Sequence, residues 1–439
     1  MGLCRAVTGS SWGNEATYGY SRSSLRRTDD ERKYLASARP TFGVGMKILH
    51  ITEIYPDVEH GIGVWGGGEK QFYEMSKIMA KRGHDVTVLT CKFPGQSGEE
   101  LTNGVRVLRF GLTRDPKTGG ARRAILPIFG YVLETAKRAL RLRPEVVHCN
   151  TYFPVYPGKI LSVLEGVPLV TTFHDVYGLG GWVDAQRSIV WGLLGHIATV
   201  AAAKLQHHRI IAVSPQCKRK LQRLGIRSEL ISIIPNGIDL KLFDSMQTDQ
   251  VPCQILYVGR LVHFKHVDTL VRAFAEVVKV IPEASLKIVG DGPENSTLRQ
   301  LSNRLGLQEK ITFTGVTPTY EAAARHFKES TVFVLPSTVE GESIAVKEAM
   351  AATLPVIAMK VKGSGVLSLI QDGVNGILLE PNQPSVLADA LKELLRNDNR
   401  RERMGVAARK SVERYDWTIM AQRILGLYNE VRLDNSHLL

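Results

Sequence analysis

The hydrophobic positions of this chain fall into two kinds of segment that alternate from Met46 onward. Short apolar runs, typical of buried parallel strands, are followed by longer stretches whose apolar residues recur with a helical period. This alternation predicts strand–helix–strand units with parallel strands and helices on the faces of the sheet. The first series of expected strands covers residues 47–52, 85–90, 105–110, 146–150, 169–173, 210–213 and 231–234.

A second series of strands follows a turn-rich linker, Pro235-Asn236-Gly237-Ile238-Asp239. The fold class is therefore predicted to be α/β, with two Rossmann-like domains at 46–235 and 236–415 and ligands outside the carboxyl ends of the strands. A last amphipathic segment, 416–433, is expected to be a helix. The strands of the second series are expected at residues 254–258, 285–289, 311–314, 332–335, 356–359 and 376–379.

Residues 1–45 differ from the rest of the chain because they are rich in Ser, Arg, Gly and Tyr and show no sustained period. Such composition predicts a disordered N-terminal extension or a start codon placed too early. A targeting peptide fits less well, because the segment lacks an apolar core.

Length and composition indicate how large a hydrophobic core the chain can bury and in which kind of compartment it works. With 439 residues, of which 44% are hydrophobic, the chain can bury two cores of ordinary size. The longest apolar run, from Ile189 to Ala203, carries His196 and is too short to span a membrane, so it is expected to be a core or interfacial helix. The five cysteines are isolated and lack metal-like spacing, which indicates a reducing compartment and no structural metal.

The net charge of +13 suggests an anionic partner, and the cations are concentrated in two segments. Residues 114–143 contain eight Lys or Arg against two acids, and residues 204–227 contain seven and no acid. Few aromatic side chains accompany these cations, which argues against nucleic acid. The first of these segments also contains apolar residues, which predicts either a helix that docks on anionic membranes or a core helix with a solvated basic side. The cations beside these apolar residues are Arg122, Arg123, Lys137, Arg138, Arg141 and Arg143.

The most informative segment runs from Glu340 to Ala351. It follows a buried strand and a turn, and Ser343 is a suitable N-cap for the helix that begins there. A helix N-terminus at the end of a parallel strand binds anions. Glu340 and Glu348 flank this anion site, where carboxylates can accept hydrogen bonds from hydroxyls, so a nucleotide diphosphate sugar fits. The alternative is that both are ordinary acids favoured by the helix dipole.

Two further loops offer groups for a diphosphate. Gly66, Gly67 and Gly68 precede a helix and can expose backbone N–H groups as an anion nest, although a flexible loop would look the same. Arg260 and Lys265 follow the first strand of the second series and can clamp a diphosphate, whereas the alternative is a solvated basic loop.

These motifs together resemble the Glu-x7-Glu signature and surrounding loops of retaining family-4 glycosyltransferases with the GT-B fold, over about Met46 to Leu433. The resemblance implies that segment 416–433 is a return helix on the N-terminal domain, and that the first domain holds the acceptor and the second the nucleotide sugar. Two departures are visible: Glu342-Ser343 stands where the family often has Phe-Gly, and Ser368 stands where it has Glu.

The resemblance also implies roles for single residues. The catalytic residues would be Glu340, His174, Arg260 and Lys265, with Glu340 and His174 facing the transferred sugar. The alternative for His174, at the end of a strand, is a hydrogen-bonded scaffold residue. Glu348 would hold the ribose hydroxyls. The donor would be bound by Gly67, Gly68, Arg260, Lys265, Val316, Glu340, Ser343, Ile344 and Glu348.

We therefore expect a retaining, nucleotide-sugar-dependent hexosyltransferase that moves a hexose or N-acetylhexosamine from a donor such as a UDP- or GDP-sugar. No cofactor and no metal ion are expected. The acceptor would be a glycan, a lipid-linked molecule or a small molecule, and the protein would be cytoplasmic or peripheral on the cytoplasmic membrane face. A nucleotide-sugar epimerase or phosphorylase on the same fold, and a nucleic-acid-binding protein, are the alternatives.

Overall fold

The computed structural model describes residues 45–57, 67–93, 95–111, 125–186 and 188–436. The extension predicted over residues 1–45 lies outside the described residues apart from Gly45. The same holds for Gly66 and for the segment 112–124, which includes Arg122 and Arg123.

The first half of the fold, residues 46–235, contains a sheet with the strand order β3-β4-β2-β1-β5-β6-β7-β8. Its neighbouring strands are parallel except β3 and β4, which are antiparallel. Most strands bury nearly every side chain, as expected for parallel strands covered on both faces. The strands are β1 (Lys47–Ile51), β2 (Asp85–Cys91), β3 (Glu99–Thr102), β4 (Val105–Phe110), β5 (Val146–Asn150), β6 (Leu169–Phe173), β7 (Arg209–Ala212) and β8 (Ile231–Ile233).

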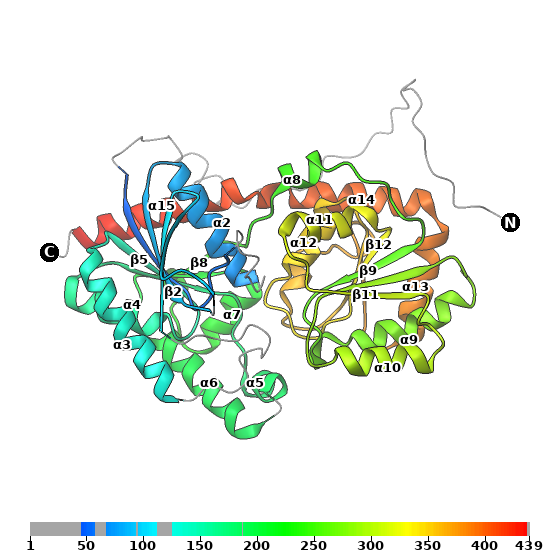
Figure 1. The fold of residues 1–439 in the computed structure, drawn as a ribbon, viewed down its shortest axis with the longest axis horizontal. Coiled ribbons are helices and arrows are strands. Elements are labelled where there is room, and N and C mark those ends of the chain that lie inside the picture. The colour runs from blue at the N-terminus through cyan, green and yellow to red at the C-terminus, as the bar shows by residue number, and fades with distance from the viewer. Residues whose placement is uncertain (1–44, 58–66, 94, 112–124, 187, 437–439) are drawn as a thin grey trace, which may run out of the picture. The chain divides into compact units, whose positions relative to one another are not determined.

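Helices cover this sheet and connect its strands (Figure 1). They are α2 (Gly67–Lys81), α3 (Ile125–Leu142), α4 (Val155–Glu165), α5 (Leu179–Gln186), α6 (Ile189–Lys204), α7 (Pro215–Arg223) and the 3-10 turn η2 (Ser228–Leu230). Within the described part of the chain, no helix is long and apolar enough to cross a membrane.

The second half, residues 236–415, contains a parallel sheet with the order β11-β10-β9-β12-β13-β14. Its strands are β9 (Gln254–Val258), β10 (Ser285–Val289), β11 (Ile311–Gly315), β12 (Val332–Leu335), β13 (Val356–Met359) and β14 (Ile377–Leu379). Its α-helices are α8 (Leu240–Ser245), α9 (Val267–Val278), α10 (Asn295–Arg304), α11 (Tyr320–Glu329), α12 (Ile344–Ala351), α13 (Pro384–Arg396) and α14 (Asp398–Val412). Its 3-10 turns are η3 (His263–Lys265), η4 (Gly365–Ser368) and η5 (Glu413–Tyr415).

The predicted fold class is confirmed, and the expected strands agree with the observed ones to within one residue at each end. The sequence interpretation missed β3, because its residues Glu-Glu-Leu-Thr form no apolar run. Its partner β4 follows after the turn Asn103-Gly104, where both residues have positive φ, 51° and 78°. Asn-Gly between two segments is the usual signal of a tight β-hairpin, so the missed strand had a readable marker.

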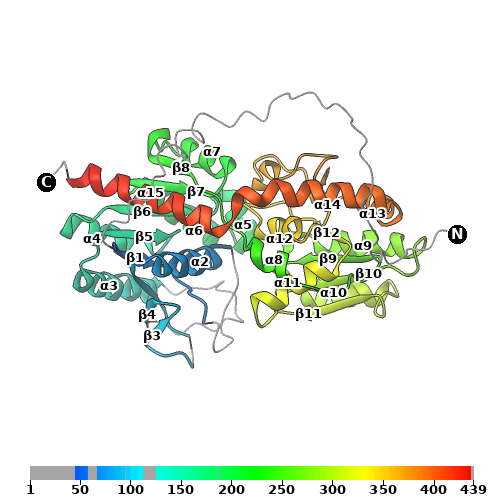
Figure 2. The same cartoon turned by 90° about the horizontal axis from the view of Figure 1, so that it is seen from above.

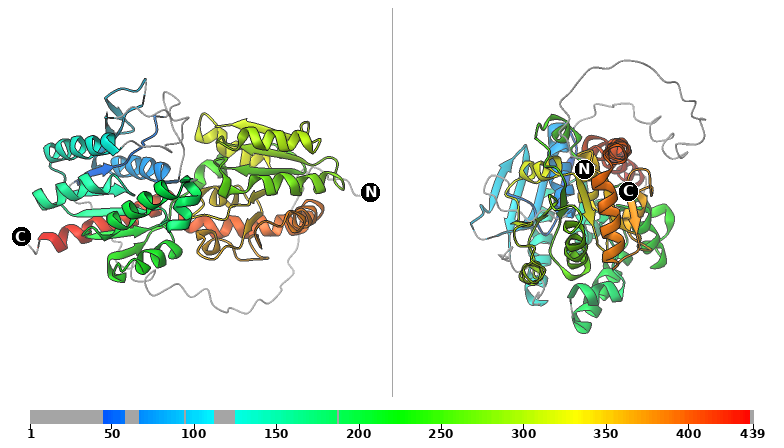
Figure 3. Two further views of the ribbon diagram at one scale, coloured as in Figure 1. Left: turned by 90° about the horizontal axis from the view of Figure 1, so that it is seen from below. Right: turned by 90° about the vertical axis from the view of Figure 1, so that its right-hand side faces the viewer.

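The last helix, α15 (Trp417–Ser436), packs on the first half although α14 before it belongs to the second. Figure 2 shows the two helices one after the other, and Figure 3 shows the same orange-to-red path from two more sides. Trp417, Ile424 and Tyr428 lie in one apolar cluster with Phe72 of α2 and Val146 of β5. The chain thus passes between the halves twice, once near Gly237 and once near Asp416.

These two connections lie side by side. Ile238 donates its N–H to the carbonyl of Tyr415 at 2.8 Å, and Trp417 donates its N–H to the carbonyl of Ile238 at 3.2 Å. A Cβ on Gly237 would lie 2.3 Å from the Trp417 ring, so only glycine fits there without displacing α15.

Candidate functional site

Helix α12 provides the N-terminus that the sequence predicts beside β12. Ser343 is its N-cap, with an extended backbone, and its hydroxyl oxygen accepts a hydrogen bond from the N–H of Val346 at 3.4 Å. The first backbone N–H groups of a helix have no carbonyl partner within the helix. The amides around Ser343 and Ile344 can therefore bind an anion.

Glu340 and Lys265 form an ion pair, which joins the loop before α12 to the 3-10 turn η3 after β9. Both side chains are largely buried. The structure thus brings together two of the predicted catalytic residues. Arg260 lies on the same loop as Lys265 and is exposed, and its carbonyl oxygen accepts a hydrogen bond from the Tyr257 hydroxyl at 3.0 Å.

Glu348 lies one turn farther along α12 and binds Lys70 of α2, with 2.6 Å between Nζ and Oε1. The Lys70 ammonium also lies 3.1 Å from the centre of the Tyr320 ring, a cation–π contact. Burial lowers the pKa of Lys70, although the Glu348 carboxylate acts in the opposite direction. The sequence analysis did not identify Lys70 as a site residue. The feature that could have identified it is its position in the first helical turn after the glycine loop.

Gly67 and Gly68 form the start of α2 and allow it to approach its neighbours closely. A Cβ on Gly68 would lie 3.0 Å from the ring of His174, and one on Gly67 would lie 3.4 Å from Ile344. The two glycines therefore bring the first turn of α2 against a predicted catalytic residue and against the N-terminus of α12.

His174 follows β6, and both of its ring nitrogens are shielded from solvent without a hydrogen-bond partner among the described residues. Burial lowers the pKa of His174 to about 4, so the ring is neutral at physiological pH. A Cβ on Gly341 would lie 2.0 Å from the carbonyl oxygen of His174, which shows how tightly the loop before α12 packs there. A neutral imidazole has one nitrogen that can donate a hydrogen bond and one that can accept.

The remaining predicted residue, Val316, follows β11 and is 63% exposed. The hydrogen bonds and ion pairs of the described residues do not join it to the carboxylates or the cations of the site. The neighbouring Gly315 accepts a hydrogen bond from the N–H of Gly290 at 2.8 Å, which aligns the ends of β10 and β11.

The departure at Glu342 has a structural reason. Glu342 is buried and pairs with Lys347 of α12, and its Oε2 accepts the N–H of Asn236 at 2.8 Å. Lys347 also donates to the carbonyl oxygen of Asn236 at 2.6 Å. Burial raises the pKa of Glu342 and lowers that of Lys347, and the pairing of the two side chains opposes both shifts. Glu342 therefore ties the loop to the linker instead of facing a sugar.

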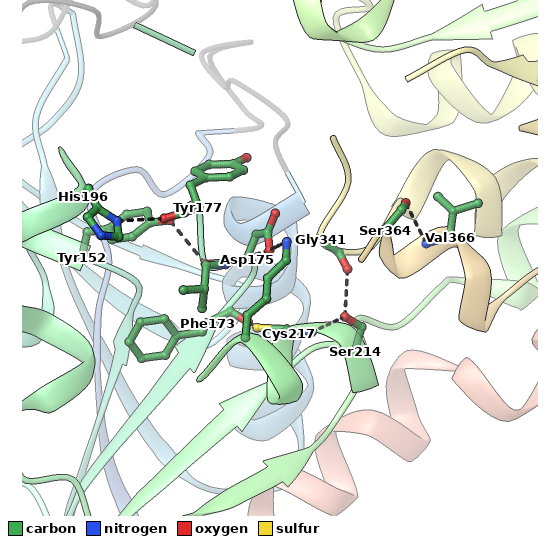
Figure 4. Close-up of polar contacts among 12 residues, drawn as sticks. Tyr152, Phe173, Asp175, Tyr177, His196, Ser214, Cys217, Gly341, Ser364 and Val366 are labelled. Atoms are coloured by element: carbon green, nitrogen blue, oxygen red, sulfur yellow. Dashed lines mark hydrogen bonds and ion pairs between the residues drawn. The ribbon is translucent and has the colours of Figure 1, made fainter. Parts of the chain in front are cut away.

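Asp175, next to His174, acts as scaffold. Its Oδ1 accepts the N–H of Val176 at 2.7 Å and binds the ammonium of Lys220 at 2.6 Å (Figure 4). Within the described ranges, no group of three or more His, Cys, Asp or Glu residues has an arrangement that could hold a metal ion. The chemistry that these residues offer is hydroxyl recognition by carboxylates beside an anion site built from Arg, Lys and a helix N-terminus.

Comparison with known families agrees with this geometry. Residues 65–242 match the family described as Glycosyltransferase Family 4, and residues 241–411 match Glycosyl transferases group 1. The D-inositol 3-phosphate glycosyltransferase of Corynebacterium diphtheriae is 26% identical over 420 residues, which is 90% of this chain and 96% of that protein. Glycogen synthase of Mycobacterium tuberculosis is 26% identical over 407 residues, 87% of this chain and 94% of that protein.

Solved structures show the same fold. Sucrose-phosphate synthase from Thermosynechococcus elongatus aligns with a TM-score of 0.73 and 24% identity, covering 88% of this chain and 98% of that one. HepE from Anabaena, in complex with UDP and glucose, aligns with a TM-score of 0.67 and 20% identity, covering 88% and 99%.

Proposed function

Because this chain belongs to glycosyltransferase family 4, we propose that it is a retaining glycosyltransferase that moves a hexose or N-acetylhexosamine from a nucleotide-diphosphate sugar. The observation that supports this best is the arrangement around α12. Glu340 precedes its N-terminus and Glu348 follows it, and Lys265 binds the carboxylate of Glu340. Glu348 would accept hydrogen bonds from the ribose hydroxyls and Glu340 from the donor sugar, while Arg260, Lys265 and the amides at Ser343 and Ile344 would hold the diphosphate.

In the proposed reaction, the bond between the anomeric carbon and the diphosphate oxygen breaks, and the acceptor oxygen bonds to the same face of that carbon. The acceptor proton passes to the departing diphosphate, so no separate base is required. Negative charge grows on the diphosphate in the transition state, and fixed cations and amide dipoles stabilise it there. Neutral His174 would orient the sugar without competing for the proton.

The donor is proposed to be a UDP- or GDP-sugar. The complex of the Anabaena protein with UDP and glucose supports the first of these. Thermal stabilisation by a panel of nucleotide sugars tests the proposal, because a ligand that binds the folded state raises the melting temperature in proportion to the logarithm of its excess over Kd. NMR of the product would then report retention. Failure of every nucleotide sugar to stabilise the protein would contradict the proposal.

We also propose that the protein binds anionic membranes peripherally, through α6. From residue 130 onward, α3 buries Tyr131 and Ala139, and Arg138 pairs with Glu134, which favours the core-helix interpretation of that segment. Helix α6 instead carries the following exposed apolar side chains: Ile189, Val190, Trp191, Leu193, Leu194 and Ile197.

Two observations support a lipid surface as the partner of α6. In the next segment, 204–227, Lys204, Lys218 and Arg227 have no carboxylate partner in an ion pair among the described residues, which suits an anionic leaflet. His196 of α6 also lines a cavity that contains Glu340, so an acceptor held in the membrane would have a short path to the donor. Apolar groups beside cations are what an interfacial helix needs.

Vesicle co-sedimentation tests this part of the proposal. The protein should pellet with anionic vesicles, and salt should weaken the binding by screening. The double variant Val190→Ser/Leu194→Ser should lose binding, whereas the matched control Val406→Ser/Ile419→Ser, with similarly exposed apolar residues on α14 and α15, should keep it. Equal and negligible pelleting with neutral and anionic vesicles at low salt would rule out the membrane partner.

A further inference from the structure

A cavity of about 340 Å³ lies where Glu340 meets α7 and the loop after β13. Its walls include Tyr177, His196 and Arg223 from the first half and Glu340 and Lys362 from the second. Figure 4 shows Tyr177 and His196 of the first wall, where the ring of His196 lies 3.4 Å from the carbonyl oxygen of Tyr177. The hydroxyl of Ser214, which caps α7, donates to the carbonyl of Gly341 at 2.9 Å and holds the two walls together.

A second cavity, of about 370 Å³, adjoins the first and shares Lys220, Arg223 and Lys362 with it, and Arg219 is added to the lining. Lys220 is neutralised by Asp175. Within the described part of the chain, Arg219, Arg223 and Lys362 have no carboxylate partner in an ion pair. Three uncompensated cations therefore line the two adjoining cavities, Arg223 and Lys362 in both and Arg219 in the second.

The acids near these cavities do not balance the cations. Glu340 is the carboxylate in the lining, and it is bound by Lys265. Neither Arg260 nor Lys265 lines either cavity, so the cations gathered here are separate from those proposed to hold the donor diphosphate. An anion in this space would lie next to the transferred sugar, because Glu340 forms part of the wall.

From this arrangement we infer that the acceptor carries a phosphate group, which Arg219, Arg223 and Lys362 bind. The guanidinium group of an arginine can donate hydrogen bonds to two phosphate oxygens at once, and the ammonium group of a lysine adds a positive charge. The cations come from both halves, α7 and the loop after β13, so a bound phosphate would contact both walls. The inference rests on the proposed function, since it names the acceptor class of that same site. The phosphate can belong to a soluble polyol phosphate or to a phospholipid headgroup.

Phosphate binding can be measured directly by a titration with inorganic phosphate that is monitored by phosphorus NMR. The titration is done with the donor site filled by the nucleotide that gives the largest thermal shift. If no nucleotide binds, Arg260→Ala is used to weaken the donor site instead, and the proposed function fails while the phosphate site is still tested. The double variant Arg223→Gln/Lys362→Gln should weaken phosphate binding at least about tenfold, since each charge-assisted contact is worth more than a neutral one. Lys220 is left intact, because its removal would leave buried Asp175 unpaired.

Arg227→Gln is the matched control: Arg227 is an exposed cation just after α7 that lines neither cavity, and its replacement should leave phosphate binding unchanged. In transfer assays, polyol monophosphates should be used in preference to the neutral polyols. The double variant should raise their KM with little change in kcat. Transfer to phosphatidylinositol in vesicles is measured in parallel, and it distinguishes a phospholipid headgroup from a soluble polyol phosphate as the acceptor.

Unchanged phosphate affinity in the double variant would overturn the inference. So would preference for neutral acceptors by an enzyme that binds its donor normally, and in that case the proposed function would stand. An effect of the double variant on the KM of the nucleotide sugar alone would also overturn it, since the cations would then recognise an acidic donor sugar.

Discussion

At the residue scale, Glu348 is expected to serve two partners: Lys70, which binds its Oε1 at 2.6 Å, and the ribose of the donor. Glu348→Gln should weaken donor binding by about 1–3 kcal/mol, since an amide is a poorer acceptor for hydroxyls than a carboxylate. Calorimetry with the donor measures the loss. Glu329→Gln, which changes a paired carboxylate outside the site, is the control. Equal donor affinity in Glu348→Gln and the unaltered protein would refute the assigned role.

Arg260 and Lys265 are expected to act on charge that grows as the diphosphate leaves. Replacing either with Ala should therefore lower kcat at saturating donor by a factor on the order of 100–1000. Lys287→Ala is a close control for Lys265→Ala, because Lys287 is similarly buried and pairs with Glu329. Turnover that survives both replacements would show that the clamp does not take part in the reaction.

The sequence was informative about residues whose role depends on a local motif and uninformative about those that act across the fold. Ser343 caps α12 as its position in the turn predicts. Lys70 and Glu342, by contrast, gain their meaning from partners far along the chain, Glu348 and Asn236. No local pattern encodes such pairs, because they form only once the two sheets and the linker are in place.

At the scale of elements, α15 is held by a buried hydrogen-bond chain around Tyr428. Ser76 donates to the carbonyl of Phe72 at 2.6 Å, so its oxygen accepts from Nδ1–H of His50 at 2.7 Å. Neutral His50 then has an acceptor at Nε2 for the Tyr428 hydroxyl, at 3.1 Å. The Tyr428 oxygen in turn accepts from Nδ1–H of His148 at 2.5 Å. Both rings are thereby fixed as one neutral tautomer.

These buried hydrogen bonds of His50 and His148 make the attachment of α15 sensitive to acid. Burial lowers the pKa of His50 to about 3 and holds that of His148 well below its usual value. Between pH 6.5 and about 3, the unfolded chain binds protons that folded His50 excludes, so stability is complete above pH 6.5 and falls as the pH is lowered. The loss is about 1.4 kcal/mol per pH unit for each such histidine. Melting temperatures that stay constant from pH 7 to pH 4.5 would contradict this.

Removing the hydroxyl tests the same chain without changing pH. Tyr428→Phe leaves a buried ring nitrogen on His50 and one on His148 without a partner, which should cost about 1–3 kcal/mol for each group. Denaturant unfolding at pH 7.5 measures the difference. Gln422→Ala, an exposed change on the same helix, should have almost no effect. If the two variants are equally stable, the hydrogen bonds of Tyr428 contribute nothing to the docking of α15.

At the scale of the whole molecule, Met46–Leu439 cluster as one compact unit by internal contacts. A chain that begins at Met46 is therefore expected to fold with a similar melting temperature and to keep transferase activity. Both are compared with the 439-residue chain under the same conditions. Loss of either would show that residues 1–45 complete the fold or the site.

The whole reaction centre has to balance the negative charge that grows on the leaving group. A departing nucleotide diphosphate needs positive charge, which a divalent ion supplies in many enzymes. Here Arg260, Lys265 and the amide dipoles at the N-terminus of α12 are expected to supply it, and the sequence contains no Asp-x-Asp triplet to hold an ion at the diphosphate. Turnover should therefore persist in excess EDTA and should not rise when magnesium or manganese is added. Activity that EDTA abolishes and either ion restores would show that the protein cations alone do not stabilise the leaving group.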